Sequence, residues 1–193
     1  MKPKLLKMEK KYSVAIYPSQ AVIDSVKTMK DYLKSKIEWY NSCNSVAHIT
    51  ICEFIFDEAE INSIKKKLFK ISDTFTPFQV DLDHFESYEN GAFFIAPSKQ
   101  SKEKLKPVLK KTQEALRISA LKKSNDPHIS IGRKLIPENL KIASQLFTTI
   151  EIDFLCKEIV LRELDPIKKQ FFVIENFPFG SNPQPEFVQG SLF

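Results

Sequence analysis

The sequence repeats itself at an offset of about 80 residues, and this duplication restricts the possible folds more than any other feature. Residues 16–19 (Ile-Tyr-Pro-Ser) recur as 95–98 (Ile-Ala-Pro-Ser). His48-Ile49-Thr50-Ile51 recurs as His128-Ile129-Ser130-Ile131 at nearly the same offset. A single four-residue match is weak, but several elements that keep one offset within a residue indicate a duplicated unit.

Each repeat contains the same order of secondary structure. Strand-like runs at 12–16 and 92–95 precede helical patterns, and strand-like runs at 48–51 and 128–131 precede a second helical pattern. Each repeat then ends in strand-like sequence, at 77–88 and at 152–164, and a last run follows at 170–174. Pro137 suits the first turn of its helix, whereas Pro107 leaves the start of an earlier helix uncertain. The apolar stripes of the four helices are Val22, Val26, Met29, Leu33 and Ile37; Ile61, Ile64, Leu68 and Ile71; Leu105, Val108, Leu109, Thr112 and Leu116; and Leu140, Ala143, Phe147 and Ile150.

This β-α-β-α-β order, given twice, predicts an α+β fold. We expect two lobes at about 12–88 and 91–177, each a mainly antiparallel sheet covered by two helices on one face. A pseudo-two-fold axis would relate the lobes, and their uncovered faces would form a central cleft. The bilobal domain would span 12–178, after a basic N-terminal segment, 1–11. A C-terminal extension, 179–193, would follow, with Phe187, Val188, Leu192 and Phe193 as apolar residues that could dock onto the body.

Composition and charge bound the function only loosely. Lys and Arg outnumber Asp and Glu by 29 to 24, which fits a polyanionic partner such as RNA or a nucleotide, or a solubility charge without a partner. No motif specific for DNA is present. Cys43, Cys52 and Cys156 form no C-x-x-C pair, so we expect free thiols in a reducing compartment. Neither a secretory signal nor an apolar stretch of about 18 residues is found, and we expect a cytoplasmic protein without a membrane span. The oligomeric state is open, with a monomer favoured.

The repeated motifs carry the residues best suited to chemistry. Side chains alternate along a strand, so His48 and Thr50 would share one face about 6.6 Å apart, as would His128 and Ser130. A two-fold axis would bring the two faces together. One imidazole could then remove a proton while the other donates one, as cleavage of a phosphodiester requires. The hydroxyls could donate hydrogen bonds to phosphate oxygens. The chemistry would need neither a metal nor a cofactor.

Some of the candidate residues also have plainer interpretations. A metal site would need a third or fourth ligand that no nearby pattern supplies, and a lone histidine in a strand is more often structural. His84 has no counterpart in the other repeat and is interpreted as structural. Strict alternation points Arg133 away from the cleft, and we leave it and Lys134 out of the core site. Four aromatic residues could stack on a base, although core packing is the better interpretation of each: Trp39, Tyr40, Phe85 and Tyr88.

At these motifs the chain resembles the two-histidine phosphoesterase superfamily, which includes 2′-5′ RNA ligase-like proteins and cyclic phosphodiesterases. Its signature is a pair of H-x-[T/S]-x motifs roughly 80 residues apart, and the resemblance covers about residues 12–178. The resemblance implies a bilobal fold, acid and base roles for His48 and His128, and phosphate binding by Thr50 and Ser130. Proline often precedes each histidine in relatives; the second motif keeps Pro127, but the first has Ala47.

The resulting expectation is a phosphodiesterase that hydrolyses 2′,3′-cyclic phosphates or 2′-5′ linkages of RNA or nucleotides without a metal. Which histidine is the acid stays open at this point. A non-catalytic module that binds RNA or nucleotides through the same fold is the alternative, and a scaffold without a ligand is a third. A site that only binds phosphate would favour Arg and Lys over near-neutral imidazoles. The paired histidines therefore argue against the non-catalytic binding module.

Overall fold

One antiparallel sheet runs through the whole molecule, and helices cover its outer side. The structure is a computed structural model that describes residues 8–183. In that range the strands follow the order β7-β3-β4-β6-β2-β1-β8-β9, with the short β5 paired to β2. Every strand pair is antiparallel. The α+β class and the antiparallel pairing are therefore confirmed. The strands are β1 (Glu9–Ile16), β2 (Ile49–Asp57), β3 (Phe78–Tyr88), β4 (Ala92–Pro97), β5 (Lys122–Lys123), β6 (Ile129–Gly132), β7 (Ile152–Cys156), β8 (Glu158–Asp165) and β9 (Gln170–Pro178).

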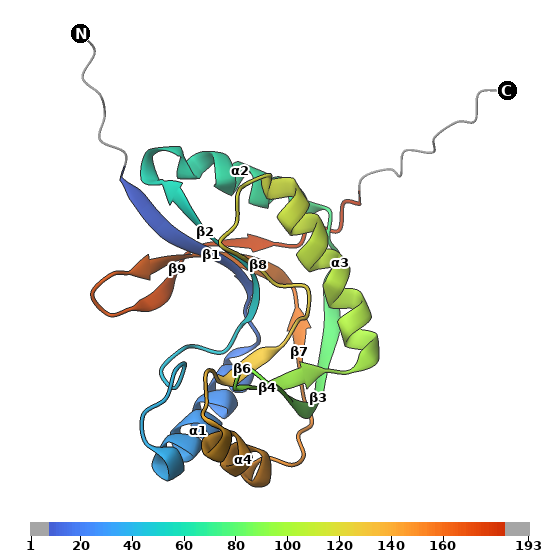
Figure 1. The fold of residues 1–193 in the computed structure, drawn as a ribbon. Coiled ribbons are helices and arrows are strands. Elements are labelled where there is room, and N and C mark those ends of the chain that lie inside the picture. The colour runs from blue at the N-terminus through green and yellow to red at the C-terminus, as the bar shows by residue number, and fades with distance from the viewer. Residues whose placement is uncertain (1–7, 184–193) are drawn as a thin grey trace, which may run out of the picture.

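The helices form two groups at opposite ends of the molecule (Figure 1). They are α1 (Gln20–Ile37), α2 (Ile61–Asp73), α3 (Lys99–Leu116) and α4 (Pro137–Leu146), and a short 3-10 helix, η1 (Glu58–Glu60), precedes α2. Helix α1 packs against α4 and β6, while α2 packs against α3 and β9. Each group therefore combines one helix from each sequence repeat.

The strands are mixed between the repeats in the same way. Strand β3, from the first repeat, pairs with β4 and β7 from the second, while β8 and β9 extend the sheet beyond β1. The repeats are thus intertwined rather than two self-contained lobes. A short hairpin explains part of this, because only three residues connect β3 to β4 and Gly91 at their end has φ = 80°. Such a loop holds its two strands side by side.

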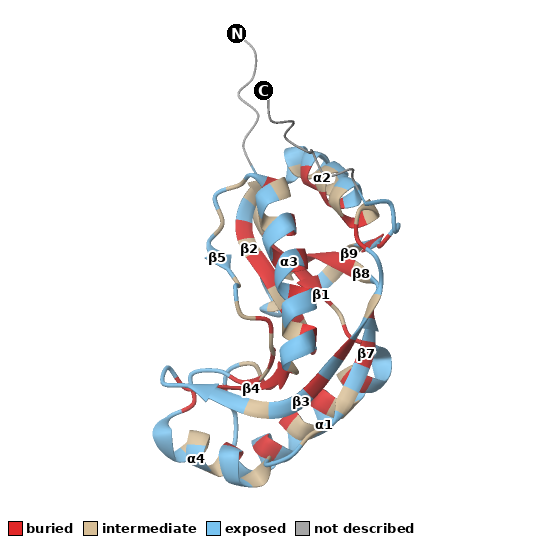
Figure 2. Cartoon of the chain, turned by 90° about the vertical axis from the view of Figure 1, so that its right-hand side faces the viewer, coloured by how far each residue is buried: buried red, intermediate tan, exposed pale blue. Residues whose placement is uncertain are grey.

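The predicted stripes are the buried faces of the helices. Figure 2 shows buried residues concentrated on the central strands and recurring at intervals along the helices. Val22, Val26 and Leu33 of α1 are buried, as are Leu105 and Leu109 of α3. Apolar area removed from water at these positions is the main favourable contribution to folding.

Three segments differ in detail from the sequence pattern. Helix α3 begins at Lys99, where the Ser98 side chain caps its first turn, so Pro107 lies inside the helix rather than at its start. Helix α4 ends at Leu146, before the predicted Ile150. The single predicted run at 152–164 is two strands, since the chain leaves β7 at Lys157 and joins the other half of the sheet as β8.

The two ends of the body extend past the expected boundaries. Strand β1 begins at Glu9, so Lys10 lies within the sheet, where it pairs with Glu58 at 2.6 Å and Glu163 at 2.9 Å. At the other end, the ring of Phe179 packs on Phe75 with 5.3 Å between centroids. Residues 1–7 and 184–193 lie outside the described part of the chain, and with them Phe187, Val188, Leu192 and Phe193.

Candidate functional site

Strands β2 and β6 bring the two repeated motifs together at the centre of the sheet. Ile49 and Ile129 are direct cross-strand partners in this antiparallel pair. Extending that register by one residue on either side places His48 opposite Ser130 and Thr50 opposite His128. The local two-fold axis therefore passes between the two isoleucines. Diagonal neighbours in such a pair are about 7–8 Å apart, which is the expected separation of the two histidines.

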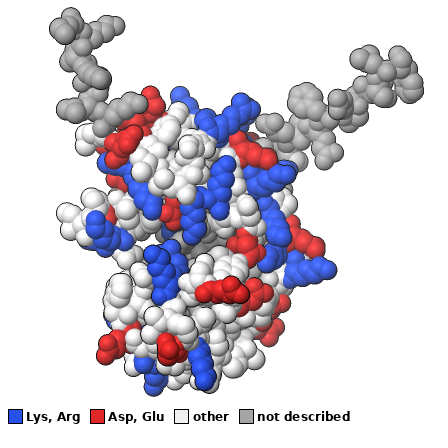
Figure 3. Space-filling model, in the orientation of Figure 1, with Lys and Arg blue, Asp and Glu red and all other residues white. Residues whose placement is uncertain are grey.

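All four residues singled out in the sequence line one small pocket. Ile49, Ile51, Ile129 and Ile131 are fully buried on the opposite face, as strand alternation predicts. Figure 3 shows the molecule hollowed at mid-height, with Lys and Arg side chains around the hollow. The pocket is lined by Ser45, Val46, His48, Thr50, Lys122, Ser124, His128, Ser130 and Arg133.

Both histidines are held in the same way by the backbone. Nδ1 of His48 lies 2.6 Å from the carbonyl oxygen of Val46, and Nδ1 of His128 lies 2.8 Å from that of Asp126. Because a carbonyl oxygen can only accept, Nδ1 is the donor in each case. The proton that each ring gains or loses is therefore carried on Nε2. The two motifs thus present equivalent proton-transfer atoms, each with its tautomer fixed.

The charges around His48 favour its neutral form. Burial is the main reason that the pKa of His48 is well below its ordinary value, and the nearby Arg162 guanidinium adds to the effect. Arg162 is itself 2% exposed and donates from Nη2 to the Ser13 hydroxyl at 2.6 Å. Its guanidinium also lies over the ring of Tyr17, which in turn lies 6.3 Å from the His48 ring, between centroids.

His128 has an acidic neighbour that His48 lacks. Burial again lowers the pKa of this imidazole, but the bond to the Asp126 carbonyl and the charge of the Asp126 carboxylate oppose the shift. That carboxylate accepts a hydrogen bond from the Tyr88 hydroxyl and is paired with Lys102. The ring of Phe94 packs on His128 with 4.5 Å between centroids. The two sites are alike in geometry but different in charge.

A pH titration should show this difference. We expect both imidazoles to titrate below pH 6.5, with His48 the lower of the two, in NMR measurements of their ring nitrogens. The unfolded chain would bind these protons at a higher pH than the folded one. The free energy of unfolding should therefore fall as pH drops from about 6.5 toward the folded pKa values. Replacing His48 with Gln should make that fall shallower in urea titrations, and an imidazole titrating at or above 6.5 would contradict the assignment.

The pocket contains Arg133, which the sequence pattern left out of the core site, and residues such as Lys122 and Ser45 that the pattern did not mark. Strand β6 ends at Gly132, and the amide of Arg133 donates to the Asn41 carbonyl at 3.1 Å. Alternation therefore stops there, which lets Arg133 line the pocket despite its position in the pattern; Lys134 does not line it. Lys122 and Ser45 come from segments far from the motifs in sequence, and no sequence signal marks them. The end of β6 at Gly132 is the information that would have placed Arg133 in the pocket.

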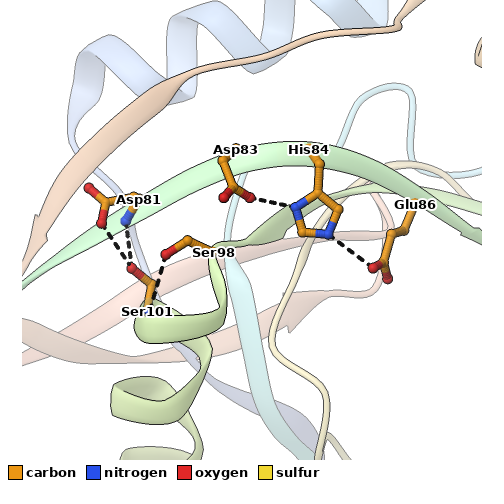
Figure 4. A network of polar contacts seen from close by, with 6 residues as sticks. All are labelled: Asp81, Asp83, His84, Glu86, Ser98 and Ser101. Carbon is orange, nitrogen blue, oxygen red and sulfur yellow. Dashed lines mark hydrogen bonds and ion pairs between the residues drawn. The ribbon is translucent and has the colours of Figure 1, made fainter.

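His84 lies outside the pocket, in a separate polar cluster. Figure 4 shows its ring on β3 between two carboxylates. Nδ1 is 2.5 Å from Asp83, and Nε2 is 3.0 Å from Glu86. The hydrogen bond to Asp83 is the main reason that the pKa of His84 is raised. In the same view Ser101 links the Ser98 cap of α3 to Asp81 on this strand.

The four aromatic candidates have different surroundings. Tyr88 is closest to the chemistry, with its ring 6.0 Å from that of His128, between centroids. Tyr40 is buried, and Phe85 stacks on Phe93 with 5.5 Å between centroids. Trp39 is 65% exposed, so the core-packing interpretation is wrong for this residue. Tyr88 therefore packs beside a motif histidine, but none of the four aromatic residues is among those that line the pocket.

Neither a metal-ligating cluster nor a membrane helix occurs in the described part of the chain. Among residues 8–183, no group of three or more His, Cys, Asp or Glu side chains is arranged to hold a metal ion. All three cysteines are buried free thiols. Within the same range, none of the helices has the length and apolar character that crossing a bilayer demands.

Comparison with known proteins identifies the family. Residues 19–166 match the model of the 2′-5′ RNA ligase superfamily. The chain belongs to this superfamily. The match covers well over half the sequence, and it confirms the resemblance to the two-histidine phosphoesterases that the paired motifs indicated. No curated protein matches the chain at the level of sequence.

Solved structures confirm the 2′-5′ RNA ligase fold. Escherichia coli LigT complexed with NADP+ superposes with a TM-score of 0.63 at 12% identity, covering 90% of this chain and 99% of LigT. TT0787 of Thermus thermophilus gives 0.55 at 16% identity, with 88% and 98% covered. Kluyveromyces marxianus Usb1 gives 0.53 at 14% identity, again with 88% and 98% covered. At these identities the likeness concerns the fold.

Proposed function

We propose that this chain is a phosphodiesterase that cleaves 2′,3′-cyclic phosphates or 2′-5′ phosphodiesters of RNA or nucleotides without a metal ion. The observation that carries the proposal is the pair of imidazoles in one pocket, each fixed through Nδ1 and each with a hydroxyl on the partner strand. Two proton-transfer groups on opposite sides of one phosphate are what this reaction needs.

The chemistry can be written with the residues of the pocket. One Nε2 takes a proton from the attacking water as its oxygen bonds to phosphorus, and the other Nε2 donates a proton to the departing sugar oxygen. The hydroxyls of Thr50 and Ser130 donate to the non-bridging oxygens, whose negative charge grows during the step. Arg133 and Lys122 add positive charge at the pocket wall. Water supplies the hydroxyl group that the product gains, and both histidines exchange protons with solvent to reset.

The surrounding charges support a division of labour between the two histidines. His48 is next to the Arg162 cation, whereas His128 is next to the Asp126 carboxylate. A neutral imidazole acts as a base and a protonated one as an acid. We therefore assign His48 as the base and His128 as the acid for hydrolysis of a cyclic phosphate. Ligation or the reverse of the same step would exchange these roles.

The substrate class also draws on the superfamily. Solved relatives of this fold include LigT complexed with phosphate and with 3′-AMP. Both ligands carry the phosphate that this pocket would hold between its histidines. A nucleotide or RNA end is therefore the partner that the pocket and the family support together.

A metal-free activity screen tests the proposal. Purified protein in excess EDTA would be given 2′,3′-cyclic nucleotides and 2′-5′-linked dinucleotides, with 3′-5′-linked dinucleotides as matched controls. We expect turnover of at least one of the first two classes, and its loss in the double variant His48→Ala/His128→Ala. Full inhibition by EDTA, or equal turnover by the double variant, would reject the proposal. Tight RNA binding without any turnover would instead support the binding-module alternative.

A further inference from the structure

Lys30 is a buried cation directly behind the wall of the pocket. Its side chain projects from α1 and is 1% exposed. Nζ donates to the carbonyl oxygen of Ser45 at 2.7 Å and to the hydroxyl of Ser45 at 2.9 Å. In the described part of the chain its hydrogen-bond partners include no carboxylate. The charge is therefore held by one neutral residue, and that residue lines the pocket.

Such a lysine is unfavourable for folding by itself. Burial, with the nearby Arg133 as a second cause, lowers the pKa of Lys30 to about 8. Taking an ammonium out of water costs free energy, and here its hydrogen bonds to a single neutral residue must offset that cost. The stability of the fold therefore gives no reason for a lysine at this position. The two hydrogen bonds of Lys30 indicate instead that it acts on Ser45.

Those bonds fix the segment that leads into the first motif. The Ser45 hydroxyl donates to the Ser42 carbonyl at 2.9 Å, and the Ser42 hydroxyl lies 3.2 Å from the carbonyl of Ile131 on β6. The next residue, Val46, provides the carbonyl that accepts from Nδ1 of His48. A continuous set of contacts thus connects the buried ammonium to the atom that sets the His48 tautomer.

The second motif is held by different residues. There the accepting carbonyl belongs to Asp126, which also lies 3.2 Å from the Ser124 hydroxyl, and its carboxylate is paired with Lys102 of α3. The hydrogen bonds of the Lys30 ammonium within residues 8–183 go to Ser45 instead. His128 is therefore an internal reference, because a change at Lys30 should affect one histidine and leave the other as it was.

We propose that Lys30 is a positioning residue for His48, which it serves by holding Ser45 so that the Val46 carbonyl keeps the His48 proton on Nδ1. The expected effect of Lys30 on the reaction rate rests on the proposed function, but its expected effect on the His48 tautomer does not. Without the ammonium, the segment before the motif can move, and Nδ1 loses its fixed acceptor. The ring then samples the other tautomer and other orientations, and Nε2 is no longer aimed at the phosphate.

The test compares Lys30→Met with Lys27→Met. Lys27 lies on the same helix but is exposed and paired with Asp31 at 2.7 Å, so its variant controls for replacing a lysine of α1 with Met. In Lys30→Met we expect NMR of the ring nitrogens to show a mixture of His48 tautomers and an unchanged His128. We expect kcat/KM to fall about 10- to 100-fold, chiefly through kcat, because small misplacements of a reacting group have effects of this size. The melting temperature should stay near that of the unmodified protein, and Lys27→Met should match that protein throughout.

Two outcomes would overturn the proposal. One is an unchanged His48 tautomer in Lys30→Met; the other is an equal disturbance of both histidines, which would indicate a general structural role. If Lys30→Met does not fold, Ser45→Ala removes one acceptor and should give a smaller shift of His48 in the same direction; no shift there would also reject the proposal. Because the NMR readout needs no turnover, it decides the role of Lys30 even if His48 proves dispensable for activity.

Discussion

Replacing either His48 or His128 with Ala should lower kcat/KM for a 2′,3′-cyclic nucleotide by about 10²–10⁴-fold, the usual size of a general acid or base contribution. Each change removes one proton-transfer atom while leaving β2 and β6 in place, since the histidines lie on the pocket face and the adjacent isoleucines carry the packing. The loss should appear mainly in kcat, because the substrate's phosphate keeps its other contacts. Steady-state kinetics in excess EDTA would measure it.

The pair should act as a unit, and a third histidine provides the control. The double variant should be little slower than the slower single variant, because proton donation without proton removal gains little. His84→Ala should retain full activity, since His84 lies outside the pocket between Asp83 and Glu86. The assignment would be wrong if either single pocket variant kept its rate within about threefold.

The pocket hydroxyls should have the second largest effect. Thr50→Val and Ser130→Ala each remove a donor while keeping nearly the same shape. Because negative charge on the phosphate oxygens is greatest in the transition state, kcat should fall while KM changes little. Loss of one such donor typically costs about 10²–10³-fold in rate. Rates of the purified variants with one cyclic nucleotide at saturating and at low concentration would separate the two constants.

Conservative changes sharpen this test. Thr50→Ser keeps the hydroxyl and should recover most of the rate lost in Thr50→Val. Thr28→Val is the matched control, since Thr28 lies on the exposed side of α1 and its hydroxyl donates to the Asp24 carbonyl within its own helix. A Thr50→Val protein as fast as Thr50→Ser would show that the hydroxyl does not contact the reacting phosphate.

The repeat made much of this architecture predictable. Because β2 and β6 occupy equivalent places in the two repeats, a two-fold relation was enough to bring His48 and His128 together. The alternation of isoleucines with polar residues predicted which face each side chain occupies, and the pocket lining agrees. Local periodicity also located all four helices, although in α4 only Ala143 of the predicted stripe is buried, and Phe147 and Ile150 lie beyond the end of the helix.

The features that could not be predicted from the sequence depend on long-range packing. No glycine or proline marks Lys157, where the chain leaves one half of the sheet for the other, so one strand was expected where two exist. The intertwining of the repeats follows from which strands pair, and a linear pattern does not contain that information. Arg133 was missed because alternation holds only as far as the strand does. Lys30 reads as one more lysine on a helix until its burial is known.

The central claim is that both imidazoles act on one phosphorus atom, and a crystal structure with a uridine–vanadate complex tests it most directly. Vanadate bound to the ribose hydroxyls imitates the five-coordinate phosphorus of the transition state. The account predicts Nε2 of His48 and Nε2 of His128 at hydrogen-bond distance, about 2.6–3.2 Å, from oxygens on opposite sides of the same vanadium. It also predicts the Thr50 and Ser130 hydroxyls on the remaining oxygens. A vanadium contacted by only one of the two rings would contradict it.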